Sequence, residues 1–252
     1  MGKTLTEIAQ LLKKSTKKVQ LIYAFNGVGK TRLSREFIKP KESADEQSDS
    51  NQDSYFSNKE CLYYNALTED LFYWDNDSNG GTEPEMYIRQ NPFIDWIIGE
   101  RGQDQNIIAN FQRYTDEKLT PSFIEKEISN YHDGKRIIKK TFPEVNFSFT
   151  RGDERSENIK ISKGEERNFI WSIFFTLLNE IAGILSEKDL DKRDDNQFDS
   201  LKYVFIDDPV SSLDENHLIE MAIDLAQLIK SLTHTLSFII TTHNPLFYNV
   251  LH

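Results

Sequence analysis

Residues 24–31 read Ala-Phe-Asn-Gly-Val-Gly-Lys-Thr, and this run limits the possible fold more than any other part of the chain. An apolar stretch, Val19–Tyr23, precedes it, and a helix-like segment, Arg32–Phe37, follows it. A strand, a glycine-containing loop, a lysine, a hydroxyl residue and a helix in this order are the layout of a phosphate-binding loop. One position departs from that pattern, because Ala24 stands where the first glycine is expected. The run predicts an α/β core that binds a nucleotide.

The residue types in the loop suit a triphosphate. A side chain at either glycine would obstruct backbone N–H groups that turn inward around the phosphates. Lys30 supplies a positive charge for the outer phosphates, and Thr31 offers a hydroxyl to Mg²⁺ at the start of a helix, where the dipole favours anions. We expect the nucleotide to contact one continuous stretch: Asn26, Gly27, Val28, Gly29, Lys30, Thr31 and Arg32.

Two carboxylates follow a second apolar strand. Tyr203–Ile206 is continuously apolar and ends in Asp207 and Asp208. Nucleotide sites of α/β sheets lie at the carboxyl ends of the strands, where an aspartate can hold Mg²⁺. We therefore expect Asp207 to bind the metal and Asp208 to orient the attacking water. A plain strand that ends in a polar turn is the alternative.

The composition is that of a globular protein of 252 residues with a net charge of −11. This charge argues against a nucleic-acid-binding role for the whole surface, although local basic clusters remain. The single cysteine, Cys61, fits a reducing cytosol. We expect no signal peptide and no membrane span, and hence a cytoplasmic location.

Hydrophobic periodicity divides the chain into three parts, with the core in residues 1–92 and 146–252 and a helical lobe in residues 93–145. The polar stretch Lys41–Ser54 predicts a mobile insertion. Helices are predicted at Thr4–Leu12, Phe93–Ile98, Ile107–Tyr114, Phe123–Tyr131, Ser162–Leu185 and Leu218–Leu232. Strands are predicted at Val19–Tyr23, Cys61–Ala66, Phe142–Thr150, Ile159–Ile161, Tyr203–Ile206 and Leu236–Ile240.

The run from Asp208 to Asp214, Asp-Pro-Val-Ser-Ser-Leu-Asp, resembles the Walker B and D-loop region of ATP-binding-cassette (ABC) ATPases. Asp208 stands where most of these proteins carry glutamate, and this shorter acid suggests slow turnover. Ser162-Lys163-Gly164-Glu165 resembles the ABC signature motif, although Ser-x-x-Glu is also an ordinary helix capping box. His243, inside Thr-Thr-His-Asn-Pro, matches the switch histidine of the same family.

This resemblance implies an α/β, ABC-type P-loop NTPase core that uses ATP or GTP with Mg²⁺. It implies catalytic roles for Asp208 and His243 and metal binding by Thr31 and Asp207. In a head-to-tail homodimer or higher homo-oligomer, the second copy would present Ser162, Gly164, Glu165 and Asp214 to the nucleotide. Asn65, after the strand Cys61–Tyr64, is the candidate for the Q-loop position.

Within the ABC superfamily, the chain resembles the NTPase half of PrrC-type bacterial anticodon nucleases and their RloC-type relatives. The resemblance rests on residues 1–9, 21–27, 31–37, 161–168 and 241–248. It implies an NTPase that senses phage infection and controls a tRNA-cutting nuclease domain located beyond His252. It also implies a DNA restriction–modification partner that keeps this toxin silent.

Two other functions fit the same motifs. The first is a DNA-processing ATPase of the repair or SMC-like type, against which the lack of a sustained heptad repeat counts. The second is a nucleotide sensor that binds tightly and rarely hydrolyses, which Asp208 in place of glutamate favours.

Overall fold

The computed structural model describes residues 2–39, 60–65, 71–75, 84–89, 91–132, 135–209, 215–232 and 236–252. The predicted insertion Lys41–Ser54 and the D-loop residue Asp214 lie outside these ranges. The chain forms two compact units, one made of Met1–Ala66 with Leu178–His252 and the other of Leu67–Leu177. These units divide the chain differently from the predicted boundaries at residues 92 and 145.

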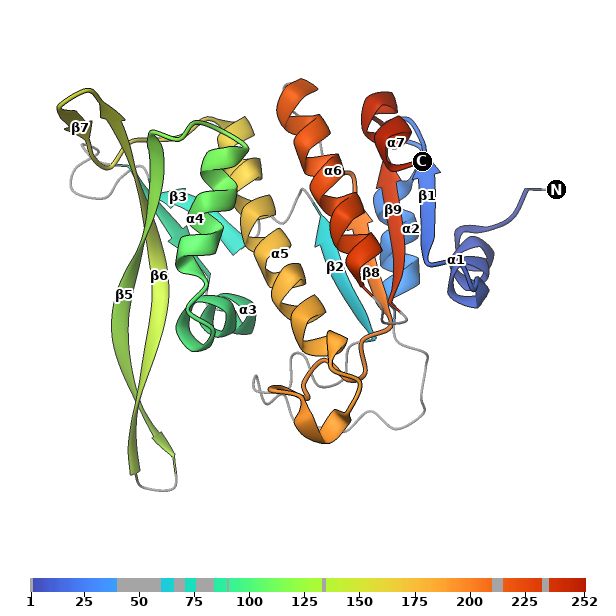
Figure 1. The fold of residues 1–252 in the computed structure, drawn as a ribbon, viewed down its shortest axis with the longest axis horizontal. Coiled ribbons are helices and arrows are strands. Elements are labelled where there is room, and N and C mark those ends of the chain that lie inside the picture. Colours follow the sequence, from blue (N-terminus) through green and yellow to red (C-terminus); the bar gives the residue numbers. More distant parts are fainter. Residues whose placement is uncertain are drawn as a thin grey trace. The chain divides into compact units, whose positions relative to one another are not determined.

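A parallel sheet forms the centre of the first unit (Figure 1). Its strands lie in the order β1 (Val19–Tyr23), β9 (Ser237–Thr242), β8 (Tyr203–Asp207) and β2 (Cys61–Asn65), and each neighbouring pair is parallel. The helices of this unit include α1 (Leu5–Lys14), α2 (Lys30–Ile38), α6 (Glu215–Ser231) and α7 (Pro245–Leu251). The predicted α/β class with a parallel sheet is confirmed.

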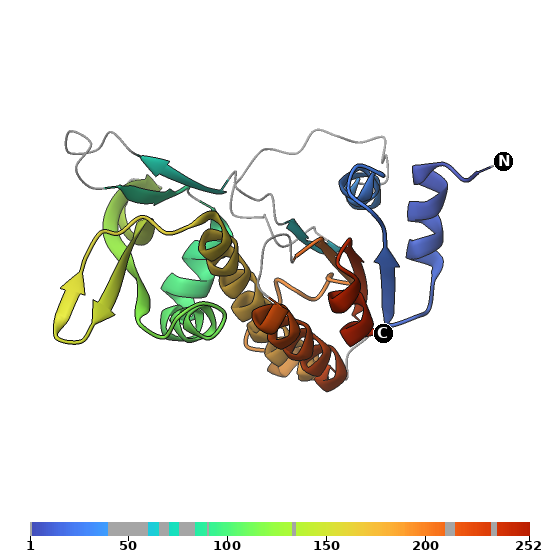
Figure 2. The ribbon, with the colours of Figure 1, turned by 90° about the horizontal axis from the view of Figure 1, so that it is seen from above.

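Helices cover both faces of this sheet, with α2 on one side and α6 on the other (Figure 2). Residues 204–206 of β8 and 238–240 of β9 are accordingly apolar and buried, as expected for central parallel strands. On one face, Leu33 and Phe37 of α2 pack with Ala9 of α1 against Phe205 and Ile239. This packing holds α2 against the sheet and so fixes the position of the loop that leads into it.

Helix α1 begins with a capping box formed by Thr4 and Glu7. The Thr4 hydroxyl accepts from the Glu7 N–H at 3.2 Å, and the Glu7 carboxylate accepts from the Thr4 N–H at 2.7 Å. Two backbone donors that the helix leaves without an internal partner are thereby satisfied. The predictions for β1, β2, β8, β9, α2 and α6 are also confirmed to within a few residues.

The second unit contains an antiparallel sheet with the order β3 (Phe72–Asp75), β4 (Glu85–Ile88), β6 (Lys135–Arg151) and β5 (Leu119–His132), while β7 (Glu154–Ser156) pairs with β6. Its helices include α3 (Pro92–Ile94), a π-helix (Asp95–Glu100) and α4 (Asp104–Arg113). The rings of Phe111, Phe147 and Phe169 form the core, with centroids 5.2–5.9 Å apart.

Two sequence predictions are wrong in this unit. Phe123–Tyr131 was predicted as a helix but belongs to β5, where a register shift between Ile124 and Lys126 interrupts the alternation that marks a strand. A strand was predicted at Ile159–Ile161, but the strand of this region is Glu154–Ser156, because Gly152 at φ 60° turns the chain early. Residues 93–145, predicted as a helical lobe, therefore contain long strands as well as helices.

The long helix α5 (Lys163–Ser186) begins in the second unit and ends in the first. Contrary to the sequence prediction, it is long and apolar enough to cross a membrane by length and composition alone. Of its most apolar window, 78% is buried inside the structure, as in the core helix of a soluble protein.

Candidate functional site

The loop between β1 and α2 has the backbone that its glycines predict. Gly27 and Gly29 adopt φ angles of 81° and 106°, in the left-handed region that side chains disfavour. The Ala24 N–H donates to the Thr242 carbonyl of β9 at 2.9 Å, which anchors the start of the loop to the sheet. The side chain of Val28 is mostly exposed. Thr31 lies in the first turn of α2, and Arg32 beside it is exposed.

The Lys30 ammonium lies at the centre of this loop. The residue is only 9% exposed, and its Nζ donates to the Ala24 carbonyl at 3.0 Å and to the Asn26 Oδ1 at 3.1 Å. It also lies 3.2 Å from the Asp208 Oδ2. Lys30 thus connects the phosphate loop to the acid that follows β8, about 180 residues later in the chain.

Asp208 joins three elements. Its backbone has φ 51°, its N–H donates to the Thr241 carbonyl at 3.0 Å, and its carboxylate pairs with Lys30. Both carboxylate oxygens lie 2.7 Å from the His243 Nδ1, and Oδ1 also accepts from the His243 N–H at 3.2 Å. A non-glycine residue in this conformation is uncommon and is often found at functional sites. The structure therefore brings Lys30, Asp208 and His243 together.

Asp207 lies at the same edge of the sheet, as the last residue of β8, and only 1% of its surface is exposed. Its Oδ1 accepts from the Thr241 hydroxyl at 2.5 Å, whereas its Oδ2 is buried and has no hydrogen-bond partner among the described residues. Leaving a buried carboxylate oxygen without a partner is costly unless something else binds it. Oxygen donors such as this Oδ2 and the Thr31 hydroxyl suit Mg²⁺, so the residues present fit the metal that the sequence predicts.

The predicted Q-loop residue, Asn65, lies at the same edge. It ends β2 and is in register with Asp207 of β8. Because the carboxyl ends of parallel strands meet at one edge, Asn65 is positioned beside the two acids at the level of the backbone.

The signature-like residues lie at the start of α5, in the second unit. The Ser162 N–H donates to the Glu165 carboxylate at 2.6 Å, and the Glu165 N–H donates to the Ser162 hydroxyl at 3.3 Å. Ser162 is exposed, and Gly164 lies in the first turn of the helix. The structure thus forms the capping box, and an exposed serine opens a 24-residue helix.

Sequence reasoning missed Thr241, which contacts both acids. It is fully buried, in register with Asp207 across β8 and β9, and it bonds Asp207 through its hydroxyl and Asp208 through its carbonyl. The available signal was a threonine inside the strand Ser-Phe-Ile-Ile-Thr-Thr, where a buried parallel strand ordinarily carries valine or isoleucine.

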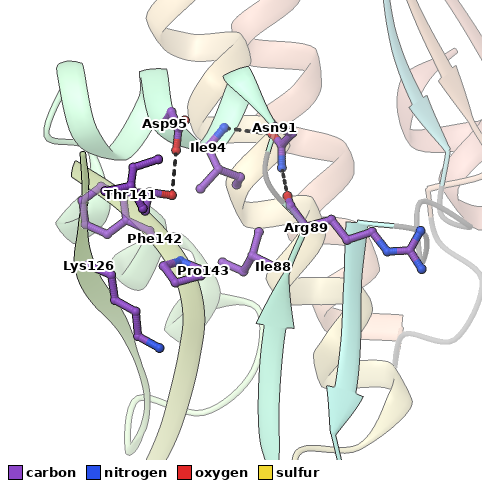
Figure 3. A pocket seen from close by; sticks show the side chains of 10 residues that line it. Ile88, Arg89, Asn91, Ile94, Asp95, Lys126, Thr141, Phe142 and Pro143 are labelled. Atoms are coloured by element: carbon purple, nitrogen blue, oxygen red, sulfur yellow. Dashed lines mark hydrogen bonds between the residues drawn. The ribbon is translucent and has the colours of Figure 1, made fainter. Parts of the chain in front are cut away.

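A separate pocket of about 210 Å³ lies in the second unit (Figure 3). Its buried Asp95 lies 2.9 Å from the Lys139 ammonium and 3.5 Å from the Thr141 hydroxyl. Asn91 donates to the Arg89 carbonyl and accepts from the Ile94 N–H. The buried Asp95 and Asn91 of this pocket therefore have partners, whereas the Asp207 Oδ2 has none among the described residues.

No protein-family profile matches the chain. An anticodon nuclease of Escherichia coli is 51% identical to it over 274 residues, and this alignment covers 100% of the chain. The chain is a homologue of that anticodon nuclease. It spans 65% of the length of this relative, so the alignment leaves about a third of the nuclease unmatched.

Two solved structures resemble the fold weakly. The Smc head domain of Pyrococcus furiosus with an extended coiled coil, bound to the C-terminal domain of ScpA, has a TM-score of 0.36 at 12% identity, over 62% of this chain and 31% of that one. The SmcHead bound to the C-winged helix domain of ScpA has a TM-score of 0.32 at 12% identity, over 62% and 38%. Similarity at this level carries no argument about function.

Proposed function

We propose that the chain is an ABC-type nucleoside triphosphatase that binds ATP or GTP with Mg²⁺ and regulates a tRNA anticodon nuclease. The observation that carries the NTPase part is the convergence on Asp208. The Lys30 ammonium approaches its carboxylate from the phosphate loop, and the His243 ring approaches it from the end of β9. Both contacts lie at the carboxyl ends of parallel strands, where α/β folds bind nucleotides.

Each residue of the site has a role in this proposal. The backbone N–H groups from Asn26 to Gly29 surround the phosphates, and Lys30 neutralises the outer ones. Thr31 and Asp207 hold Mg²⁺, which when bound neutralises charge on the phosphate oxygens. Asp208 orients the attacking water.

The tautomer of His243 follows from its contact with Asp208. Because a carboxylate can only accept, Nδ1 donates to Asp208. The other ring nitrogen, Nε2, is the one that this proposal assigns to the γ-phosphate. Arg32 lies at the α2 end of the loop and contributes positive charge there.

Lys30 has to exchange partners during binding. Its ammonium is bound by two carbonyls, one side-chain amide oxygen and Asp208. A triphosphate carries more negative charge than one carboxylate, so it replaces Asp208 as the counter-ion of Lys30. Asp208 is then released from the lysine and can accept a proton from water.

The second half of each site comes from another copy of the chain in this proposal. Ser162, Gly164 and Glu165 open a long helix whose N-terminus favours anions, and Ser162 is exposed. Ser162 and Gly164 would contact the γ-phosphate held by a head-to-tail partner. Glu165 and Asp214 would lie at the same nucleotide site. Closure of the pair on the nucleotide, and its opening after hydrolysis, would switch the nuclease.

The regulatory role is supported by the 51% identity to an anticodon nuclease. In this proposal, the tRNA-cutting activity belongs to the part of such proteins that the chain does not span. The NTPase senses phage infection, works in the cytoplasm as part of an antiviral toxin, and is held inactive by a restriction–modification partner. The sequence of the gene beyond codon 252 tests this proposal, because it predicts a nuclease domain there and no long coiled coil.

A nucleotide sensor with rare turnover is the second candidate. It is favoured by one observation, namely that the Asp208 carboxylate is shorter than the usual glutamate and is already bound by both Lys30 and His243. A carboxylate held in this way is less available to water than a free one.

Phosphate release separates the two candidates. The purified chain is incubated with Mg²⁺ and either ATP or GTP, beside the variants Lys30→Ala and Asp208→Ala. An NTPase releases phosphate in multiple turnovers that both variants lose. Tight binding of nucleotide without turnover supports the sensor, and absence of binding to the wild-type chain overturns both.

A further inference from the structure

We infer that Thr241 is a positioning residue for the magnesium ligand Asp207, an inference that rests on the proposed nucleotide site. Thr241 lies on β9 in register with Asp207 of β8 and is fully buried. Its Oγ1 donates to the Asp207 Oδ1 at 2.5 Å. The other oxygen of this carboxylate, Oδ2, is buried without a hydrogen-bond partner among the residues that the structure describes.

This asymmetry determines which oxygen is available to a cation. The Thr241 hydroxyl occupies one oxygen and so fixes the rotation of the carboxylate about its Cβ–Cγ bond. The second oxygen then points in one defined direction, which lowers the entropy lost when a cation binds it. Groups that bond a metal ligand from behind commonly orient it in this way.

Packing alone does not explain a threonine at this position. The preceding residues of β9, Phe238, Ile239 and Ile240, are apolar and have no exposed surface. Valine has the same β-branched shape as threonine, is typical of buried parallel strands, and would not require a hydrogen-bond partner. The hydroxyl therefore serves the carboxylate that it bonds.

Thr241 also connects the two acids. While its side chain bonds Asp207, its carbonyl accepts from the Asp208 N–H at 3.0 Å. A substitution that removes only the hydroxyl leaves this backbone bond in place. Thr241→Val therefore removes the hydrogen bond to the Asp207 carboxylate and keeps the backbone hydrogen bond to Asp208.

The test measures the Mg²⁺ dependence of nucleotide binding with a fluorescent triphosphate analogue. Thr241→Val is expected to raise the half-saturating Mg²⁺ concentration about 10- to 100-fold, as loss of a supporting group does at metal sites. Affinity for the same analogue in EDTA is expected to stay within about twofold of wild type, since the phosphate loop is unchanged. Thr241→Ser, which retains the hydroxyl, is expected to restore wild-type Mg²⁺ dependence.

Thr242→Val is the matched control. Thr242 is the next residue of β9, equally buried, and its hydroxyl accepts from the Asn244 N–H at 3.1 Å. This variant should leave the Mg²⁺ requirement unchanged. If wild type and Thr241→Val both bind nucleotide with the same Mg²⁺ dependence, the inference about Thr241 is wrong and the proposed function still stands. Lack of Mg²⁺-dependent binding in the wild-type chain overturns both the inference and the proposed function.

If Thr241→Val loses binding in EDTA as well, or melts well below wild type, the Thr241→Ser variant decides. A serine variant that folds like wild type but requires more Mg²⁺ contradicts the inference, because the hydroxyl is then present without the effect assigned to it. A serine variant with wild-type folding and Mg²⁺ dependence supports it.

Discussion

The Lys30 ammonium lies 3.2 Å from the Asp208 carboxylate, so the cation of the phosphate loop is paired with the acid that the proposal assigns to catalysis. The two side chains are 8% and 17% exposed, which places the pair in a setting where a charge without a partner is costly. A ligand that enters the loop has to supply a better partner for Lys30 than Asp208 does.

Removal of the lysine charge should abolish nucleotide binding. We expect Lys30→Ala to weaken triphosphate affinity at least about 100-fold, because charge-assisted hydrogen bonds to the outer phosphates are lost. Titration with a fluorescent triphosphate measures this change. Lys39→Ala is the control, since Lys39 lies at the end of the same helix with an exposed side chain and should leave affinity unchanged. Equal affinity in both variants would contradict the role of Lys30.

Neutralising Asp208 should separate binding from turnover. Asp208→Asn keeps the shape of the side chain and tolerates the left-handed backbone at φ 51°. Nucleotide affinity is expected to rise about two- to fivefold, because Lys30 no longer has to break an ion pair with a carboxylate before it binds phosphate. Phosphate release is expected to fall at least about 100-fold, because the amide cannot accept a proton from the attacking water. Calorimetric titration and a phosphate assay on one preparation measure both. Weaker binding by this variant would argue against the exchange of partners.

Loss of the His243 imidazole should affect the rate more than the affinity. His243→Ala is expected to lower kcat about 100-fold and to change the dissociation constant of the nucleotide by less than about threefold, since the ring acts on the γ-phosphate in the transition state. His217→Ala, on α6, provides a histidine control that should keep the wild-type kcat. A large loss of affinity with unchanged kcat would assign His243 to ground-state binding instead.

Two inactive variants should restore activity when mixed, if each site is shared between copies. Lys30→Ala disables one half of the site and Ser162→Arg the other. A mixed head-to-tail dimer contains one intact site, so an equimolar mixture is expected to regain about a quarter of wild-type phosphate release. Activity of the mixture no greater than that of the separate variants would place all the required residues in a single chain.

The cap of α1 gives a prediction about stability. Thr4→Ala removes the hydroxyl of the capping box and should destabilise the first unit by about 1 kcal/mol, which lowers Tm by about 2–4 °C. Thermal denaturation followed by circular dichroism measures the shift. Gln10→Ala, at an exposed position inside the same helix, should leave Tm nearly unchanged. A similar decrease for both would mean that the cap contributes nothing specific.

The elements around the site could be predicted from the sequence because their signals are local. The glycines near Lys30 require an unusual backbone, and the apolar runs before Asp207 and His243 are typical of buried parallel strands. The sequence order of these motifs also indicated that they share one edge of a sheet. The pairing of Asp208 with both Lys30 and His243 could not be predicted, since it depends on side-chain positions set by packing.

The second unit was less predictable for physical reasons. Its strands β3 and β4 have four residues each, too short for a clear alternation, and the bulge near Ile124 hides the period of β5. The role of Thr241 depends on its register with Asp207, a contact between residues 34 positions apart. No local pattern in the sequence reports such a contact.

A crystal structure of the chain with Mg²⁺ and a non-hydrolysable triphosphate tests the central claim most directly. The account predicts that the Lys30 ammonium leaves Asp208 and lies about 2.7–3.1 Å from a phosphate oxygen, with the Asp207 carboxylate directed toward the metal. Triphosphate bound elsewhere, or bound in the loop with Lys30 still paired to Asp208, would contradict it.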